Sequence, residues 1–110
     1  MYDQPTPITI EINGRERFLG SLEDNAITAA EERLGPDLFD ACVKWIYKGR
    51  PSGGWFTAVL ENDLRQAVNR ADAVNLKRLP DLVRWLYSYA PSLCYGTPER
   101  VSNWANLDWP

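Results

Sequence analysis

The residues of this sequence best suited to chemistry lie in a loop at positions 48–54, which runs directly into Trp55. Gly53 and Gly54 would let a ligand approach the backbone closely, and a helix that begins there presents unpaired N–H groups and a partial positive charge. Further donors come from Lys48, Arg50 and the hydroxyl of Ser52. The pattern predicts a cradle for an anion or a phosphate group, although its spacing matches neither a Walker loop nor a dinucleotide fingerprint. The structural alternative is a turn between two helices, with Ser52 as the cap.

A second group of polar residues follows in the same region of the chain. Asp63 and Arg70 are seven residues apart, and Phe56 precedes Asp63 by the same interval, so one long helix would place all three along its apolar face. Polar groups on a buried face must be paired, and a base such as Arg84 is the predicted partner of Asp63. The functional alternative is a pocket in which Asn62 and the arginines meet a polar ligand between aromatic rings.

Catalytic and metal chemistry have little support in the composition. The chain has no histidine, which removes the usual general base and the commonest metal ligand. Cys42 and Cys94 stand far apart, so no zinc-binding spacing is present and neither thiol has an imidazole to activate it. We therefore expect no metal, no cofactor and no enzymatic activity, and we expect Cys42 to be a buried packing residue.

Charge is distributed unevenly along the chain. Residues 1–40 carry nine acids and three arginines, whereas residues 41–110 carry six acids and nine bases, and the whole chain has a net charge of −3. This balance excludes a strongly basic nucleic-acid binder, so no direct contact with nucleic acid is expected. The polarity between the halves predicts a homo-oligomer in which acidic and basic parts meet, and simple solvation of both halves is the alternative. No apolar run is long enough for a membrane span, and the first residues do not have the pattern of a signal peptide.

The elements that must position these residues can be predicted from periodicity. With 110 residues the chain has the size of a single domain, with a hairpin arm at 1–20 and a helical body at 21–110. Alternating isoleucines at 8, 10 and 12 and an Asn-Gly pair predict a hairpin that returns over Arg15–Leu19. In that register Ile8 faces Leu19, and Glu11 faces Glu16.

The rest of the chain is predicted to be helical. Ser21 caps a first helix, which Gly35 ends, and a second helix runs from Pro36 to Lys48 with Trp45 at the edge of its buried face. Later helices are predicted at 55–73, from Leu79 to about 90, and at 99–105. The fold class is therefore mainly α, a compact bundle of four to five helices with a short N-terminal β-hairpin.

Several motifs in this body also resemble those of a known group of proteins. Residues 37–104 are similar to short phage and prophage proteins of unassigned function, which carry a Gly-Gly-Phe-like turn, an Ala-Val-Leu-x-Asn-Asp-Leu helix, an Arg-Ala-Asp step and a Gly-Ser-Pro-Glu end. The corresponding stretches here begin at Gly53, Ala58, Arg70 and Gly96. This sequence departs from the pattern at Trp55 and Thr97. The resemblance implies a virus-encoded protein of the bacterial cytoplasm and no particular activity.

Taken together, these features predict a non-catalytic binding protein that counteracts a host antiviral defence. The glycine-rich loop favours sequestration of a nucleotide signal. One alternative is an inhibitor that binds a host defence complex, for instance CRISPR-Cas, through its acidic N-terminal half. A structural or regulatory phage component is the second alternative.

Overall fold

Helices form most of the chain, as the sequence predicts. The structure is a computed structural model, and it describes residues 7–12, 15–21 and 24–109. Within these residues there are six α-helices rather than the predicted four to five. The elements are, in order, β1 (Pro7–Ile12), β2 (Arg15–Ser21), α1 (Asp24–Arg33), α2 (Pro36–Lys48), α3 (Gly53–Leu60), α4 (Leu64–Arg70), α5 (Ala73–Tyr89), the 3₁₀ turn η1 (Ser92–Cys94) and α6 (Pro98–Ala105).

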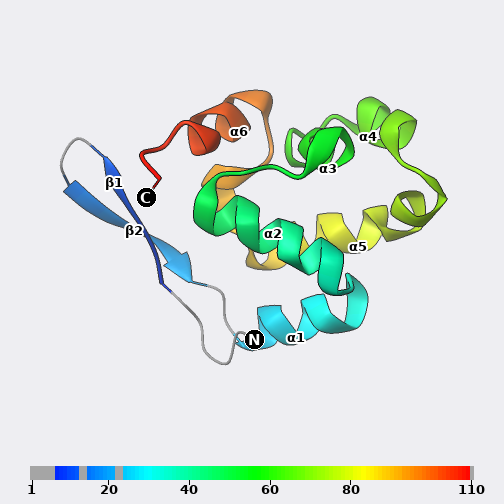
Figure 1. Cartoon of the computed structure of the whole chain (residues 1–110), viewed down its shortest axis with the longest axis horizontal. Helices are drawn as coiled ribbons and strands as arrows, with labels where there is room; N and C mark the ends of the chain where they lie inside the picture. The colour runs from blue at the N-terminus through cyan, green and yellow to red at the C-terminus, as the bar shows by residue number, and fades with distance from the viewer. Residues whose placement is uncertain (1–6, 13–14, 22–23, 110) are drawn as a thin grey trace.

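The strands β1 and β2 pair antiparallel, and Figure 1 shows them beside the helical body. A register shift between Ile8 and Thr9 places Ile8 opposite Gly20, so the predicted pairing of Ile8 with Leu19 is wrong. A β-bulge adds one unpaired residue to a strand, and simple alternation does not anticipate it. The predicted Asn-Gly turn lies outside the described residues, and a covered hairpin face stays a prediction.

The centre of the helical body is α2, with α1 on one side and α3 and α6 on the other (Figure 1). Its predicted bounds are confirmed: Gly35 takes a φ of 84° before Pro36, and Gly49 ends the helix with a φ of 65°. Both glycines occupy the left-handed region that other residues avoid. The first predicted cap is wrong, because Ser21 is the last residue of β2 and α1 begins at Asp24.

The buried face of α2 includes Cys42, as predicted, and its thiol is fully enclosed. Burial raises the pKa of Cys42 above its ordinary value and raises that of Cys94 to about 12, so both thiols stay protonated at neutral pH. Trp45 was expected at the edge of this face, but none of it is exposed. Its indole contacts Cys94, which lies far along the chain, so the apolar spacing within α2 could not reveal that this ring is covered.

Three tryptophans tie α2 to the end of the chain. The indole Nε1 of Trp45 donates to the carbonyl of Cys94 at 3.0 Å, and that of Trp104 donates to the carbonyl of Trp45 at 3.0 Å. Trp109 continues the series by donating to the carbonyl of Trp104 at 2.8 Å. This relay fixes η1, α6 and the residues after α6 against the centre of the fold, since each buried indole finds the acceptor that it requires.

The long helix predicted at 55–73 is wrong. The chain breaks at Asn62, which takes a φ of 61°, and α4 begins after Asp63, whose carboxylate accepts the N–H of Gln66 at 3.1 Å. Asn tolerates left-handed backbone and Asp is a preferred N-cap, so the pair interrupts a helix despite the apolar spacing around it. The polar residues are consequently at a helix junction and not on a buried stripe.

The next helix begins earlier than predicted. α5 starts at Ala73, where the carboxylate of Asp72 caps it by accepting the N–H of Asn75 at 2.8 Å. Pro80, expected in the first turn, lies inside the helix instead. Proline cannot donate to the carbonyl of Leu76, one turn earlier, so the helix continues through a position that weakens it.

Replacing Pro80 with alanine tests this placement. We expect Pro80→Ala to raise the free energy of unfolding by about 1–3 kcal/mol, because the variant restores a helical hydrogen bond and removes the ring, while a more flexible unfolded chain offsets part of the gain. Urea denaturation followed by circular dichroism would measure the change. A helix that began at Leu79 would instead lose a favourable first-turn proline, so an unchanged or lowered stability would contradict the observed start of α5.

Candidate functional site

The predicted glycine-rich loop connects α2 to α3 and lies on the surface. Lys48, Arg50, Ser52, Gly53 and Gly54 are all exposed. Gly53 has a φ of 81°, and α3 begins there, two residues before the predicted start at Trp55. The hydroxyl of Ser52 makes no hydrogen bond to the first turn of α3, so its predicted role as a cap is wrong and the group stays available to a ligand.

Arg70 comes to this loop from the end of α4. A Cβ atom on Gly54 would lie 2.6 Å from Nη1 of Arg70, so the guanidinium packs directly against the glycine. Nε of Arg70 donates to Oε1 of Gln66 at 3.3 Å, which orients the side chain. The structure therefore brings Arg70 to the start of α3, although it does so by folding α4 back beside α3 and not by extending one helix.

A polar cavity of about 110 Å³ adjoins the loop where three helices begin. Its walls come from the first turns of α2 and α3 and from α5 near its start. The partial positive charges of helix N-termini favour anions, whereas the carboxylate of Asp37 in the same lining disfavours them. The lining residues are Asp37, Leu38, Ala41, Ser52, Trp55, Phe56, Asn75 and Arg78.

Arg78 organises the polar side of this cavity. Its Nη2 donates to Oδ1 of Asn75 at 2.6 Å, and its Nη1 donates to the carbonyl of Leu34 at 3.4 Å and to the carboxylate of Asp37 at 3.3 Å. Desolvation acts to raise the pKa of Asp37, but the charge of Arg78 and hydrogen bonds from the Leu38 N–H and Arg78 outweigh it and hold that pKa below its usual value. The carboxylate is thus ionised and mostly exposed to water at neutral pH.

Two buried donors of residues that line this cavity have no acceptor among the residues that the structure describes. They are Nε of Arg78 and the indole Nε1 of Trp55, a residue that is only 8% exposed. The other four tryptophans each donate to a backbone carbonyl; that of Trp85, for example, donates to Ala26 at 2.9 Å. Buried donors are almost always satisfied in folded proteins. An acceptor from outside the chain, such as a water or a ligand oxygen, would complete the set.

The second predicted group of polar residues, Asn62, Asp63, Arg70 and Arg84, is not assembled into one site. Asp63 caps α4, Asn62 lies in the exposed junction before it, and Arg84 is exposed on α5. Among the residues from 25 to 109 no ion pair joins Asp63 to Arg84, and no charged side chain is buried. The helix break at Asn62 explains this outcome, because Asp63 and Arg70 then no longer lie on one face of a single long helix with Phe56.

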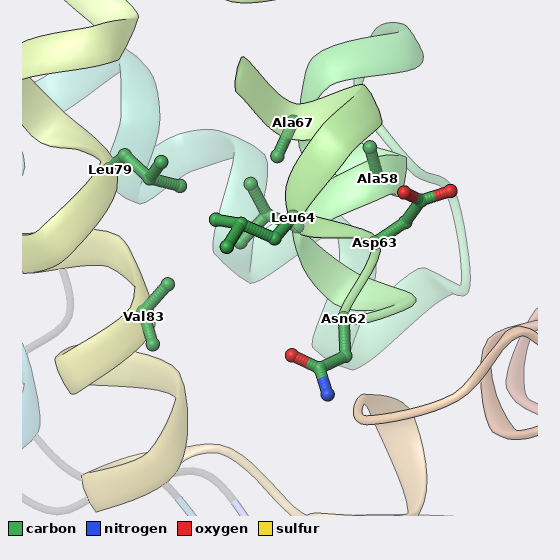
Figure 2. Close-up of a pocket in the computed structure, with 8 residues that line it drawn as sticks. Ala58, Asn62, Asp63, Leu64, Ala67, Leu79 and Val83 are labelled. Atoms are coloured by element: carbon green, nitrogen blue, oxygen red, sulfur yellow. The ribbon is translucent and has the colours of Figure 1, made fainter. Parts of the chain in front are cut away.

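Asn62 and Asp63 instead border a shallow apolar groove between α4 and α5. This α4–α5 groove has a volume of about 40 Å³ and is lined mainly by Ala58, Val59, Leu64, Ala67, Leu79 and Val83. Figure 2 shows the side chain of Leu64 pointing toward Leu79 and Val83 across it. The side chains of Leu64 and Tyr87 are 69% and 60% exposed.

Asp37, Asn75 and Arg78 are not among the residues that the sequence predicts for the site. A cap was recognisable at Asp72, since an aspartate directly before a helix commonly accepts the backbone N–H three residues later, here that of Asn75. Nothing in the sequence connects Arg78 with Asp37, which is 41 residues away. Only the packing of α5 against the α1–α2 corner brings these side chains together.

In the part of the chain that the structure describes, no group of His, Cys, Asp and Glu side chains is arranged to hold a metal ion. The same described residues contain no helix that is both long and apolar enough to span a membrane. Comparison of the chain with protein-family models, curated proteins and solved structures finds no match.

Proposed function

We propose that the chain is a non-catalytic binding protein whose ligand carries a phosphate group, such as a nucleotide signal. The observation that carries the proposal is the polar cavity at the starts of α2, α3 and α5, where Trp55 and Arg78 hold buried N–H groups without acceptors. Phosphate oxygens are strong acceptors, and helix starts favour their charge. Lys48 and Arg50 are exposed on the adjoining loop and would attract an anion from solution.

The size of the cavity sets how such a ligand would bind. Pockets for whole small molecules usually enclose about 300–1,000 Å³, and this cavity encloses about 110 Å³. It therefore suits one phosphate group, with the rest of a nucleotide lying over the exposed loop beside Arg50 and Gly54. In this arrangement Arg70 is a second cation at the mouth, since its guanidinium lies against Gly54.

The biological role that we propose follows from the resemblance to short phage proteins. A virus-encoded protein that captures a phosphate-bearing signal in the bacterial cytoplasm would deprive a host defence of its activator. Tight binding is sufficient for this role, and no bond in the ligand has to be broken.

Trp55→Phe separates ligand binding from folding. The variant removes the unpartnered indole N–H and keeps most of the ring, so it breaks no hydrogen bond of the free protein. A hydrogen bond to a charged acceptor contributes about 1.5–3 kcal/mol, so we expect affinity for the best-bound nucleotide to fall roughly 10- to 150-fold. Titration calorimetry with inorganic phosphate and a panel of linear and cyclic nucleotides would measure it.

Three further variants make the result specific. Trp85→Phe removes an equally buried indole whose N–H donates to Ala26, so it should lower stability and leave ligand affinity unchanged. Arg50→Ala should weaken binding with little loss of stability, because the residue is exposed in a loop. Asp37→Asn removes the negative charge at the cavity and should strengthen phosphate binding. The proposal fails if the folded parent binds neither phosphate nor any nucleotide, or if Trp55→Phe and Trp85→Phe change affinity equally.

A specific observation also favours the second candidate, an inhibitor that binds a host defence complex. The α4–α5 groove and the side chains around it leave several large apolar residues exposed, among them Leu64, Val68 and Leu76. Contiguous apolar surface of this kind commonly marks a protein–protein contact. This candidate takes precedence if no phosphate compound binds.

A further inference from the structure

The unpaired positive charge around the polar cavity lies beside the cavity and not in its lining. Within the lining, Arg78 forms an ion pair with the carboxylate of Asp37 at 3.3 Å, so these two charges offset each other. Lys48, Arg50 and Arg70 are exposed, and none of them forms an ion pair with a residue whose side chain the structure describes. A ligand with several negative charges would therefore be stabilised best if part of its charge lay outside the cavity.

Gly54 allows Arg70 to lie against the start of α3. A Cβ atom on Gly54 would be 2.6 Å from Nη1 and 3.3 Å from Cδ of Arg70. Gly54 is not among the glycines with a positive φ, so its backbone conformation does not require glycine. The absence of a side chain instead leaves space for the guanidinium, and Gln66 orients that group by accepting from Nε. Figure 1 shows α4 beside α3, which is the packing that brings Arg70 to this position.

Two neighbouring positions at the start of α3 thus serve different surroundings. Ser52 and Trp55 line the cavity, whereas Gly54 lies outside that lining and contacts Arg70. Consecutive helical residues are separated by about 3.8 Å between Cα atoms and by about 100° around the axis. The two positions are therefore close together but distinct. The first N–H groups of α3 belong to these same residues, and they have no acceptor within the helix and no cap from Ser52.

The cavity side of this pair lacks an acceptor. Trp55 is 8% exposed, and its Nε1 donates to no described residue. A phosphate oxygen would satisfy this donor, but the cavity of about 110 Å³ suits a single phosphate group. Any further phosphate of the same ligand must then lie outside the cavity, where Gly54 leaves the backbone open and Arg70 supplies an unpaired charge.

We propose that the ligand contains at least two linked phosphate groups, as nucleoside diphosphates and triphosphates do. This inference rests on the proposed function and specifies the class of ligand. One phosphate occupies the cavity beside Trp55, and the next lies over Gly54, where the guanidinium of Arg70 donates to it. A single oxygen bridges the two phosphates, so they can occupy sites that are one residue apart. Arginine suits the second site, because its planar fork binds phosphate oxygens in pairs.

Titration calorimetry of the full chain with two simple probes tests the proposal. The probes are inorganic phosphate and pyrophosphate, in a buffer without divalent cations. We expect pyrophosphate to bind roughly 10- to 150-fold more tightly, which is the effect of one additional charge-assisted hydrogen bond. Equal affinities would overturn this proposal and leave the proposed function intact. If neither probe binds and no nucleotide binds, both are overturned.

Three variants locate the second phosphate. Arg70→Gln should lower the ratio of pyrophosphate affinity to phosphate affinity by roughly tenfold or more. Gly54→Ala should lower the same ratio, because its methyl group displaces the guanidinium while alanine suits the helix. Arg65→Gln is the matched control, since it removes an exposed positive charge from the same helix and should leave the ratio unchanged.

Circular dichroism would verify that the variants fold. An unchanged ratio in Arg70→Gln would overturn the proposal, because the second phosphate would then not contact this residue. An equal fall of the ratio in Arg65→Gln and Arg70→Gln would also overturn it, since the preference for pyrophosphate would then reflect only general attraction between charges. Trp55→Phe should weaken the binding of both probes, because it acts on the phosphate in the cavity.

Discussion

Trp104→Ala is expected to lower the free energy of unfolding by about 3–5 kcal/mol, the usual cost of truncating a buried tryptophan. Trp104 is 1% exposed, and it occupies the middle of the indole relay. Its Nε1 donates to the carbonyl of Trp45, while its own carbonyl accepts from Trp109. Truncation would remove the first bond, open a cavity and loosen the ring contact with Trp109, whose centroid lies 5.4 Å away.

Urea denaturation of parent and variant would measure the loss. Trp104→Phe is the matched control, because it keeps most of the buried ring but leaves the carbonyl of Trp45 without its donor. An unsatisfied buried acceptor costs about 1–3 kcal/mol, so this variant should be intermediate. If Trp104→Ala lost less free energy of unfolding than Trp104→Phe, that result would contradict a central position for Trp104 in the core.

Gly49→Ala is expected to be the most damaging of the glycine substitutions. Gly49 ends α2 with a φ of 65°, and a Cβ atom there would overlap the indole of Trp109. Left-handed backbone costs a residue with a Cβ about 1–2 kcal/mol, and forcing a packed side chain aside costs typically 1–3 kcal/mol more. Chemical denaturation should therefore show a combined loss of about 2–5 kcal/mol.

The chain supplies a control for this prediction. Gly53 has a φ of 81°, but a Cβ atom on it would meet nothing within 4 Å. Gly53→Ala should therefore show the backbone cost alone, and the difference between the two variants reports the contact with Trp109. In a Trp109→Ala background that difference should disappear. Equal effects of the two glycine substitutions in the parent chain would show that Trp109 moves aside freely.

Local sequence determined the boundaries of a helix where the residues at its two ends are themselves strong start and stop signals. α2 has the predicted bounds, because Gly35, Pro36 and Gly49 specify a left-handed residue, a first helical position and a left-handed end. α3 begins at Gly53, two residues before the predicted start at Trp55. The exposed loop with Lys48 and Arg50 was likewise predictable, since a cluster of glycine, proline and serine interrupts helices on its own.

Apolar periodicity gave a wrong result where a local cap competed with it. The spacing around Asp63 fits one long helix, but Asn62 and Asp63 form a left-handed junction and an N-cap that divide it. At Pro80 a local signal predicts a boundary that is absent. Proline favours the first turn of a helix, but the cap at Asp72 starts α5 earlier and the packing of α5 keeps Pro80 inside it.

Composition, charge asymmetry, the glycine-rich loop and the mainly helical class were available from the sequence by itself. Only the tertiary structure decided which polar groups meet. Arg78 reaches Asp37 and Leu34 because α5 packs against the corner between α1 and α2, and Arg70 reaches Gly54 because α4 folds back beside α3. The unpartnered N–H of Trp55 is a tertiary property as well, because whether a buried donor has an acceptor depends on all the groups that pack around it. Helix boundaries depend on residues a few positions apart, whereas these contacts depend on the whole chain closing around its core.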